Sequence, residues 1–262
     1  MNWLASRVAL RIRSLSEVFD LGFVFLTENR KTYTKLALVT LVVPFGMTVA
    51  LQFARVPWWQ IWGAAVLLGA AIEGVFTAAA GQLLFAESLG TLRIYGLFGR
   101  RLVSYGASRI VSALVMAACA PLVIPVPPFA ARTLFVSECS LLESASPAQA
   151  LRRGGQLMQG QAGPGALFAL LLVAVRLVFI AFAEELGQGL VEFVLQLGRP
   201  VGSLFDDGGS TFALAGFFAS IPYVTATRFL GYVDRRTRRE GWDIQVRFAA
   251  LAQREGAEEA AA

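Results

Sequence analysis

The chain alternates long apolar runs with short polar segments, and this pattern predicts membrane-spanning helices. A bilayer core of about 30 Å is crossed by about 20 consecutive apolar residues in a helix. Six runs qualify as spans, with approximate bounds 33–54, 60–85, 102–124, 127–143, 164–183 and 211–232. We therefore predict an all-α fold, a polytopic integral membrane bundle of about six transmembrane helices with interfacial amphipathic helices. The membrane domain is expected to cover residues 31–233.

The run 127–143 is the weakest of the six, because it is short and contains Arg132 and Glu138. It is kept as a span because the arginine pairs at 100–101 and 152–153 are both expected in the cytoplasm. The chain between these pairs must then cross the membrane twice. A re-entrant hairpin, which turns back inside the membrane, is the alternative interpretation.

Two segments outside the spans have the periodicity of amphipathic helices. The first lies in the N-terminal region 1–30, where apolar residues recur every three or four positions from 3 to 26. A basic amphipathic helix before a span usually lies in the membrane interface, although a partner-binding helix is also open. The second covers 147–159 and follows Ser146, which with Gln149 forms a capping-box pattern around Pro147. It is too short to span, so we predict an interfacial elbow helix.

The remaining polar segments are an outer loop and a C-terminal tail. The outer loop is acidic, and its apolar residues from Leu186 to Leu197 predict a second helix lying in the membrane plane. The basic cytoplasmic tail is expected over 234–262, with Gly241 ending its arginine-rich opening. Residues 242–248 alternate between apolar and polar types, which is a weak strand signal.

Composition agrees with a membrane protein and sets its orientation. Of the 262 residues, 56% are hydrophobic and only 16% are charged, against about 25% charged in soluble domains. Segments predicted to be cytoplasmic contain 17 of the 23 Lys and Arg, and external segments contain only Arg55 and Arg199. This bias places both termini in the cytoplasm. The other four basic residues fall within predicted spans: Arg109, Arg132, Arg176 and Arg228.

The residue types argue against catalysis. The chain has no histidine, which removes the commonest general base and the commonest zinc ligand. Its two cysteines lack the spacing of a metal site, and no nucleophile–base pair or nucleotide-binding loop is recognisable. We therefore expect no enzymatic activity, no catalytic residues, no cofactor and no metal. The basic residues flank apolar runs, which favours anionic lipid headgroups as partners over nucleic acid.

Ionisable residues inside spans are the strongest candidates for a functional site. Glu73 lies near the middle of the second span and Arg176 near the middle of the fifth. An arginine at the centre of a membrane helix costs about 2.5–3.5 kcal/mol and usually faces a partner inside the bundle. We therefore predict that Glu73 and Arg176 pair. A structural ion pair and a transport or lipid-headgroup site both remain open.

Two stretches resemble a known family. They are ECSLLESASPAQALRRGGQL at 138–157 and IPYVTATRFLGYVDRRTRREGWDIQV at 221–246. Together they are similar to the membrane domain associated with bacterial glycerophosphoryl diester phosphodiesterases, which also occurs in a stand-alone form. The likeness covers roughly residues 14–248. The matching tail positions are Tyr232, Asp234, Arg236, Arg238 or Arg239, Glu240, Gly241 and Asp243.

Two departures limit what this resemblance implies. Gly154 and Gly155 stand where a serine usually follows the arginine pair of the elbow. The phosphodiesterase part is also missing, since its barrel would need roughly 250 further residues and catalytic histidines. The resemblance therefore implies a fold and a location in the bacterial cytoplasmic (inner) membrane without hydrolase activity.

From these observations we expect a non-catalytic scaffold or accessory subunit of a membrane assembly. Its partners would be anionic lipid headgroups and another membrane or cytoplasmic protein. The alternative is a small transporter or permease component that uses Glu73 and Arg176. The candidate contacts for lipid or partner are the arginines of the cytoplasmic elbow and tail: Arg152, Arg153, Arg235, Arg236, Arg238 and Arg239.

Overall fold

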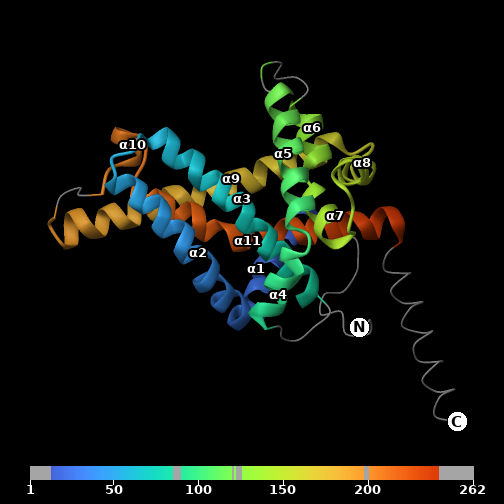
Figure 1. The fold of residues 1–262 in the computed structure, drawn as a ribbon, viewed down its shortest axis with the longest axis horizontal. Helices are drawn as coiled ribbons and strands as arrows, with labels where there is room; N and C mark the ends of the chain where they lie inside the picture. Colours follow the sequence, from blue (N-terminus) through green and yellow to red (C-terminus); the bar gives the residue numbers. More distant parts are fainter. Residues whose placement is uncertain (1–12, 85–89, 120, 122–125, 198–200, 242–262) are drawn as a thin grey trace, which may run out of the picture.

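The protein is a helical bundle built around its last helix. The computed structural model describes residues 13–84, 90–119, 121, 126–197 and 201–241. In Figure 1, α11 (Thr211–Glu240) runs through the middle of the molecule. It packs against α9 (Ala162–Gly189), α3 (Trp58–Leu83), α1 (Leu15–Glu28) and α2 (Arg30–Phe53). The described part of the chain contains no strand, in agreement with the predicted all-α fold.

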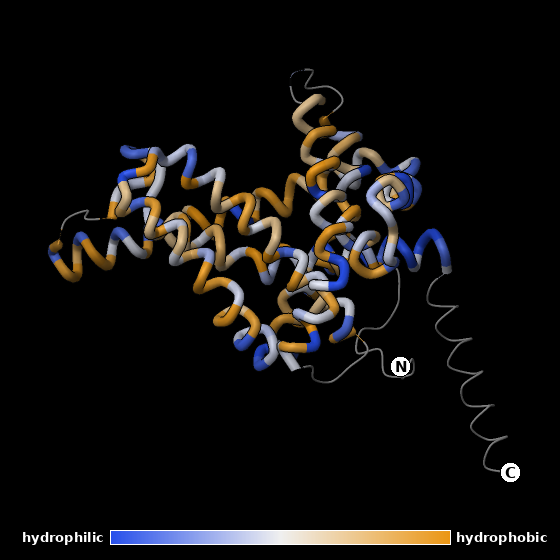
Figure 2. Tube along the Cα trace, viewed as in Figure 1, coloured by the Kyte–Doolittle hydropathy of each residue, from blue (hydrophilic) through white to orange (hydrophobic). Residues whose placement is uncertain are grey.

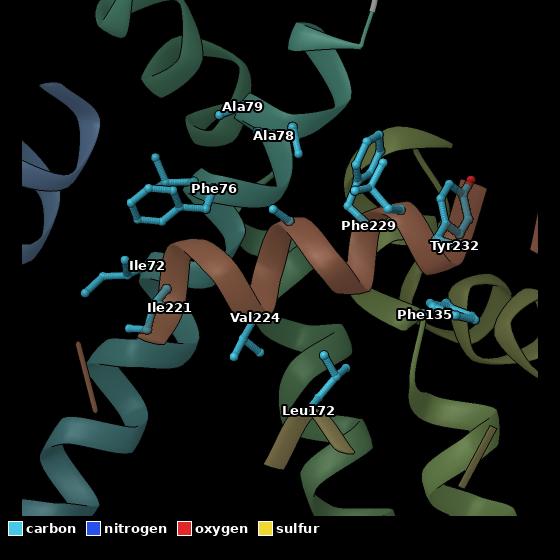
Figure 3. Packing of buried hydrophobic residues seen from close by; sticks show 14 of the residues in the cluster. Ile72, Phe76, Ala78, Ala79, Phe135, Leu172, Ile221, Val224, Phe229 and Tyr232 are labelled. Carbon is cyan, nitrogen blue, oxygen red and sulfur yellow. The ribbon is translucent and has the colours of Figure 1, made fainter. Parts of the chain in front are cut away.

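The core lies along α11, where large apolar side chains meet small ones. Figure 3 shows Ile221 and Val224 of α11 close to Ile72 of α3 and Leu172 of α9. Small residues let the helices approach closely. At Gly216 an added Cβ would lie 2.8 Å from the Cα of Ile180 in α9, so these two backbones are almost in contact.

Five helices are long and apolar enough to cross a membrane. They are α2, α3, α5 (Leu102–Cys119), α11, and α9 together with the π-helical turn Leu190–Val194. Apolar residues run along these helices (Figure 2), and on α2, α3, α5 and α9 many of them are exposed, as expected where helices contact lipid. Together these helices indicate a multi-pass membrane protein. Exposed apolar side chains on them include Leu38, Val42, Val66, Leu67, Ile110, Leu114, Leu170 and Leu177.

The fourth predicted span, 127–143, is wrong as a continuous helix. The structure divides it into α6 (Val126–Thr133) and α7 (Val136–Leu142), each far too short to cross a bilayer alone. The hydroxyl of Thr133 donates to the carbonyl of Phe129 at 2.9 Å, a local bond that competes with regular helix at the break. After the break, Glu138 is fully buried.

The chain nevertheless turns back after α5, as both sequence interpretations required. The hydroxyl of Ser104, at the start of α5, donates to the carbonyl of Ala145, just after α7, at 3.0 Å. Helices α5 to α8 thus form a second group of contacting helices beside one end of α11 (Figure 1).

The N-terminal amphipathic helix is present in the described residues as α1, and residues 1–12 of that prediction lie outside them. Ser14 caps it, accepting from the Glu17 N–H at 3.3 Å. Its buried residues Val18 and Phe25 lie on the side that packs against α11. This face is therefore covered by protein.

A helix is present where the elbow was predicted, at 147–159, and it is α8 (Pro147–Leu157). The N–H of Ser146 donates to Oε1 of Gln149 at 3.1 Å, as the capping-box pattern predicts. At Gly154 an added Cβ would lie 2.8 Å from the carbonyl oxygen of Arg132. Glycine at this position therefore lets α8 dock against the end of α6.

The predicted boundary at the end of the fifth span also differs from the structure. Leu186 lies inside α9, which continues into the π-helical turn, so the predicted separate in-plane helix is wrong. Two short helices complete the fold of the described residues. The helix α4 (Thr91–Gly99) precedes α5, and α10 (Leu204–Asp207) precedes α11.

The tail does not begin at 234, because α11 continues to Glu240. The i,i+4 ion pair between Asp234 and Arg238 lies within this extension. Gly241 ends the helix with a left-handed φ of 59°, as predicted. The possible strand at 242–248 lies outside the described residues.

Candidate functional site

Glu73 lies at the centre of a buried ionic network. Its carboxylate, on a residue only 4% exposed, contacts three arginines from three different helices. Arg176 of α9 donates to Oε1 at 2.7 Å, and Arg228 of α11 donates to Oε2 at 3.0 Å. Arg109 of α5 lies 3.4 Å from Oε2. One carboxylate therefore links α3 to α5, α9 and α11.

A second carboxylate joins the network from α7. Arg228 donates from Nε to Oε1 of Glu138 at 2.7 Å. Both residues are buried. In α11, Arg228 thus bridges Glu73 and Glu138. The network contains three guanidinium groups and two carboxylates.

Small residues and aromatic rings hold these groups in place. Gly74, next to Glu73, leaves room for the rings of Phe98 and Tyr105. The hydroxyl of Tyr105 donates to the carbonyl of Ala70 at 2.5 Å, which fixes α5 against α3. On the other side, the guanidinium of Arg176 lies 5.1 Å from the ring centre of Phe217, a cation–π distance.

A cavity of about 260 Å³ opens beside the network. Its polar wall is formed by Glu73, Arg109, Arg176 and Arg228, and its apolar wall includes Leu172. Glu138 does not line it. The cavity therefore presents three cationic side chains and one anionic side chain.

The structure brings together the two residues that the sequence paired, Glu73 and Arg176. It adds Arg109, Arg228 and Glu138, for which sequence reasoning assigned no partner. The available signal was that most ionisable residues inside the predicted spans enter this network. The exceptions include Arg132, which is exposed with its guanidinium 5.8 Å from the Phe129 ring centre, and Glu143, which pairs with Arg153.

The six arginines of the elbow and tail meet at what we call the basic end, defined as α8 together with residues 232–240 of α11. Arg153 contacts Glu143 at 2.9 Å and Glu240 at 2.6 Å. Arg236 contacts the same two carboxylates, at 3.7 and 3.2 Å. Arg153 thus ties α8 to α11, and Arg236 ties α11 to Glu143 at the end of α7. Although burial opposes it, the hydrogen bond and charges of Glu143 and Glu240 raise the pKa of Arg153.

Of the other four arginines, three are exposed and Arg235 is half-buried. Arg152 is exposed on α8, and Arg239 is exposed and donates to the carbonyl of Gln159. Arg238 pairs with Asp234 at 2.8 Å. Arg235 donates weakly to Gln161, at 3.3 Å.

A second cavity, of about 400 Å³, lies at the basic end between α1, α9 and α11. Its charged wall contains Arg13, Arg235 and Arg238 against a single carboxylate, Asp234. The N–H of Arg13 donates to this carboxylate at 2.9 Å. The apolar wall is formed by Leu15, Val18, Leu167 and Phe168.

The acidic residues of the outer segment do not form a metal centre. Glu184 is buried, and its carboxylate accepts from the N–H of Leu204 at 2.8 Å and from the hydroxyl of Ser210. It therefore ties the outer loop to α9. Across the described ranges, no group of three or more metal-ligating side chains is found.

Comparison of the chain with protein-family models, curated proteins and solved structures found no match.

Proposed function

We propose that the protein is a non-catalytic accessory subunit of the bacterial inner membrane that holds an anionic lipid headgroup at its basic end. The observation that carries this proposal is the 400 Å³ cavity between α1, α9 and α11. Its wall combines an excess of arginine with an apolar surface. A phospholipid offers the complementary arrangement, with a charged phosphate joined to acyl chains.

The orientation of the chain supports this location. The basic end contains the elbow and tail arginines, which the positive-inside bias assigns to the cytoplasm. The cytoplasmic leaflet has an anionic surface that attracts such clusters, by about 1 kcal/mol for each Lys or Arg. The resemblance to a membrane domain that also occurs in a stand-alone form agrees with a subunit that performs no chemistry itself.

Ion pairing and cavity lining favour some of the six candidate arginines over others as lipid contacts. Arg153 and Arg236 are occupied by Glu143 and Glu240, so their charges are largely neutralised within the protein. Arg235 and Arg238 line the cavity instead. Arg152 and Arg239 are exposed and are available to headgroups of the surrounding leaflet or to a partner protein.

Native mass spectrometry of the purified full chain tests this proposal. We expect it to retain phosphatidylglycerol in preference to phosphatidylethanolamine. Arg235→Gln should weaken this retention more than Arg152→Gln, because only Arg235 lines the cavity. Equal effects of the two substitutions would show that the lipid is held by diffuse attraction to the basic surface and not by the cavity. An absence of preference for the anionic lipid would reject the proposal.

A second candidate function, a small transporter or permease component, is favoured by the cavity beside Glu73 and Arg176. Ionisable residues that line a cavity inside a membrane bundle often mark a transport path. Uptake of radiolabelled phosphate into liposomes containing the purified protein tests this function. Transport predicts uptake that is lost in Glu73→Gln, whereas uptake no faster than in protein-free liposomes would contradict it.

A further inference from the structure

The charges around the intramembrane cavity do not balance. Three guanidinium groups, those of Arg109, Arg176 and Arg228, share the carboxylates of Glu73 and Glu138. Counted over the described residues, the network therefore has one positive charge in excess. A charge buried without a counter-charge costs several kcal/mol in a low-dielectric environment. An anion in the cavity would supply the missing charge.

Hydrogen-bonding capacity is unused at the same place. Arg228 is only 6% exposed, and although its Nε and Nη1 are bonded, its Nη2 is buried without a partner. The Nε of Arg176 is likewise buried without a partner. Both side chains line the cavity. Leaving a buried donor unpaired costs about 1–3 kcal/mol, so an acceptor that reached either atom would be stabilised. Oε2 of Glu138, in the same network, is also buried without a partner.

We propose that this cavity binds a phosphate-type oxyanion, held by Arg176 and Arg228 with Arg109 at the entrance. Guanidinium groups bind phosphate oxygens through paired hydrogen bonds and keep their charge when buried. Arg109 and Arg176 remain accessible, with side chains 34% and 24% exposed. Drug-sized ligands usually occupy about 300–1,000 Å³, and the 260 Å³ here suits a single phosphate group.

The phosphate group can come from a lipid headgroup or from free inorganic phosphate. The same chemistry serves both sources. The cavity is also lined by Met116 and Val173, and Ile110 and Leu114 on α5 are exposed apolar residues. A lipid could therefore place its phosphate in the cavity and its acyl chains along α5. The proposal does not depend on the cavity at the basic end. It claims only that the anion binds, and it makes no claim of transport.

The test uses the full chain, purified in detergent and stripped of lipid. Binding of radiolabelled inorganic phosphate is measured by equilibrium dialysis, and binding of phosphatidylglycerol is measured by native mass spectrometry. Arg109→Gln is the primary variant, because the ion pair of Arg109 within the described part of the chain is the 3.4 Å contact with Glu73, and its side chain is partly exposed. The matched control is Arg132→Gln, which changes an exposed arginine outside the cavity.

We expect saturable binding of at least one probe and a loss of affinity of about tenfold or more in Arg109→Gln. Arg132→Gln should bind like the unmodified protein. Phosphate binding identifies the free anion as ligand, whereas lipid binding alone identifies a headgroup. Arg235→Gln should leave binding of the probe in this cavity unchanged, which distinguishes it from lipid bound at the basic end. Absence of saturable binding of both probes, or equal losses in Arg109→Gln and Arg132→Gln, would overturn the proposal.

Discussion

Arg228 of α11 donates from Nε to Oε1 of Glu138 in α7, at 2.7 Å, and both side chains are buried. This bond ties the central helix to the short helix that follows the break in the predicted fourth span. Because the two residues are 90 positions apart in sequence, the bond connects the two groups of helices. The integrity of the bundle should therefore depend on it.

Removing the charge of Glu138 should destabilise the protein strongly. Breaking one partner of a buried ion pair costs about 3–5 kcal/mol, and Arg228 would keep only its contact with Glu73, a carboxylate that two other arginines share. Glu138→Gln keeps the shape of the side chain and should lower the free energy of unfolding by about 3 kcal/mol. For a protein of this size, that corresponds to a fall of roughly 6–12 °C in the midpoint of thermal unfolding.

The midpoint is measured in detergent by intrinsic fluorescence. Arg132→Gln is the control, because this exposed arginine has no ion pair among those found in the described residues, and its midpoint should change little. If Glu138→Gln unfolds at the same temperature as Arg132→Gln, the bond to Arg228 does not contribute to stability.

Exchanging the charges of Glu73 and Arg176 should fail to restore folding, although the two residues are in contact. Glu73 also contacts Arg109 and Arg228. In the double variant Glu73→Arg/Arg176→Glu, the new arginine would face both of these cations. Like charges at such distances repel strongly in a low-dielectric interior.

We expect the double variant to give as little monodisperse protein as Glu73→Arg alone, measured by size-exclusion chromatography in detergent. Arg176→Gln should give clearly more than either, because it removes one of three cations around the carboxylate and creates no repulsion. Recovery of the double variant to the level of the unmodified protein would indicate an isolated pair in place of a shared carboxylate.

The sequence predicted the helices better than the contacts between them. Apolar length alone located α2, α3, α5, α9 and α11, because each must satisfy its backbone within the helix and cover its surface with apolar side chains. The capping box at Ser146 similarly located α8, since it depends on neighbouring residues. Features of this local kind are readable from one sequence.

The break at Leu134 and Phe135 and most of the ionic network were not predictable in this way. Periodicity does not reveal which helices become neighbours, so Arg228 and Glu138 were recognised as intramembrane charges without a partner. The pairing of Glu73 with Arg176 was proposed because both lie near the middle of their runs. Depth alone did not indicate that Arg109 and Arg228 reach the same carboxylate.

Glycine at position 216 should be required for the contact between α9 and α11. A Cβ added there would meet the carbonyl of Phe179 and lie 2.8 Å from the Cα of Ile180, and backbone atoms cannot move aside cheaply. Gly216→Ala should therefore destabilise the protein by about 1–3 kcal/mol, as overpacked substitutions do. Thermal unfolding in detergent measures this change.

Gly63 in α3 provides the matched control, because an added Cβ there meets no atom within 4 Å. Gly63→Ala should be neutral or stabilising by up to about 1 kcal/mol, through its better helix propensity. Should Gly216→Ala match Gly63→Ala, the close approach of α9 to α11 would be disproved.

Arg153 should hold the elbow helix in place, whereas its neighbour Arg152 should not. Arg153 bridges Glu143 and Glu240, and Arg152 is exposed on the same helix. A partly exposed ion pair contributes at most about 1 kcal/mol. In Arg153→Ala, hydrogen exchange of the α8 amides should therefore accelerate by about fivefold, if exchange occurs by local opening of α8. The same measurement on Arg152→Ala should leave these amides unchanged, because no hydrogen bond or ion pair joins that side chain to another element in the part of the chain that the structure describes. Acceleration of equal size in both variants would show that lost positive charge, and not the clamp between α8 and α11, sets the stability of the elbow.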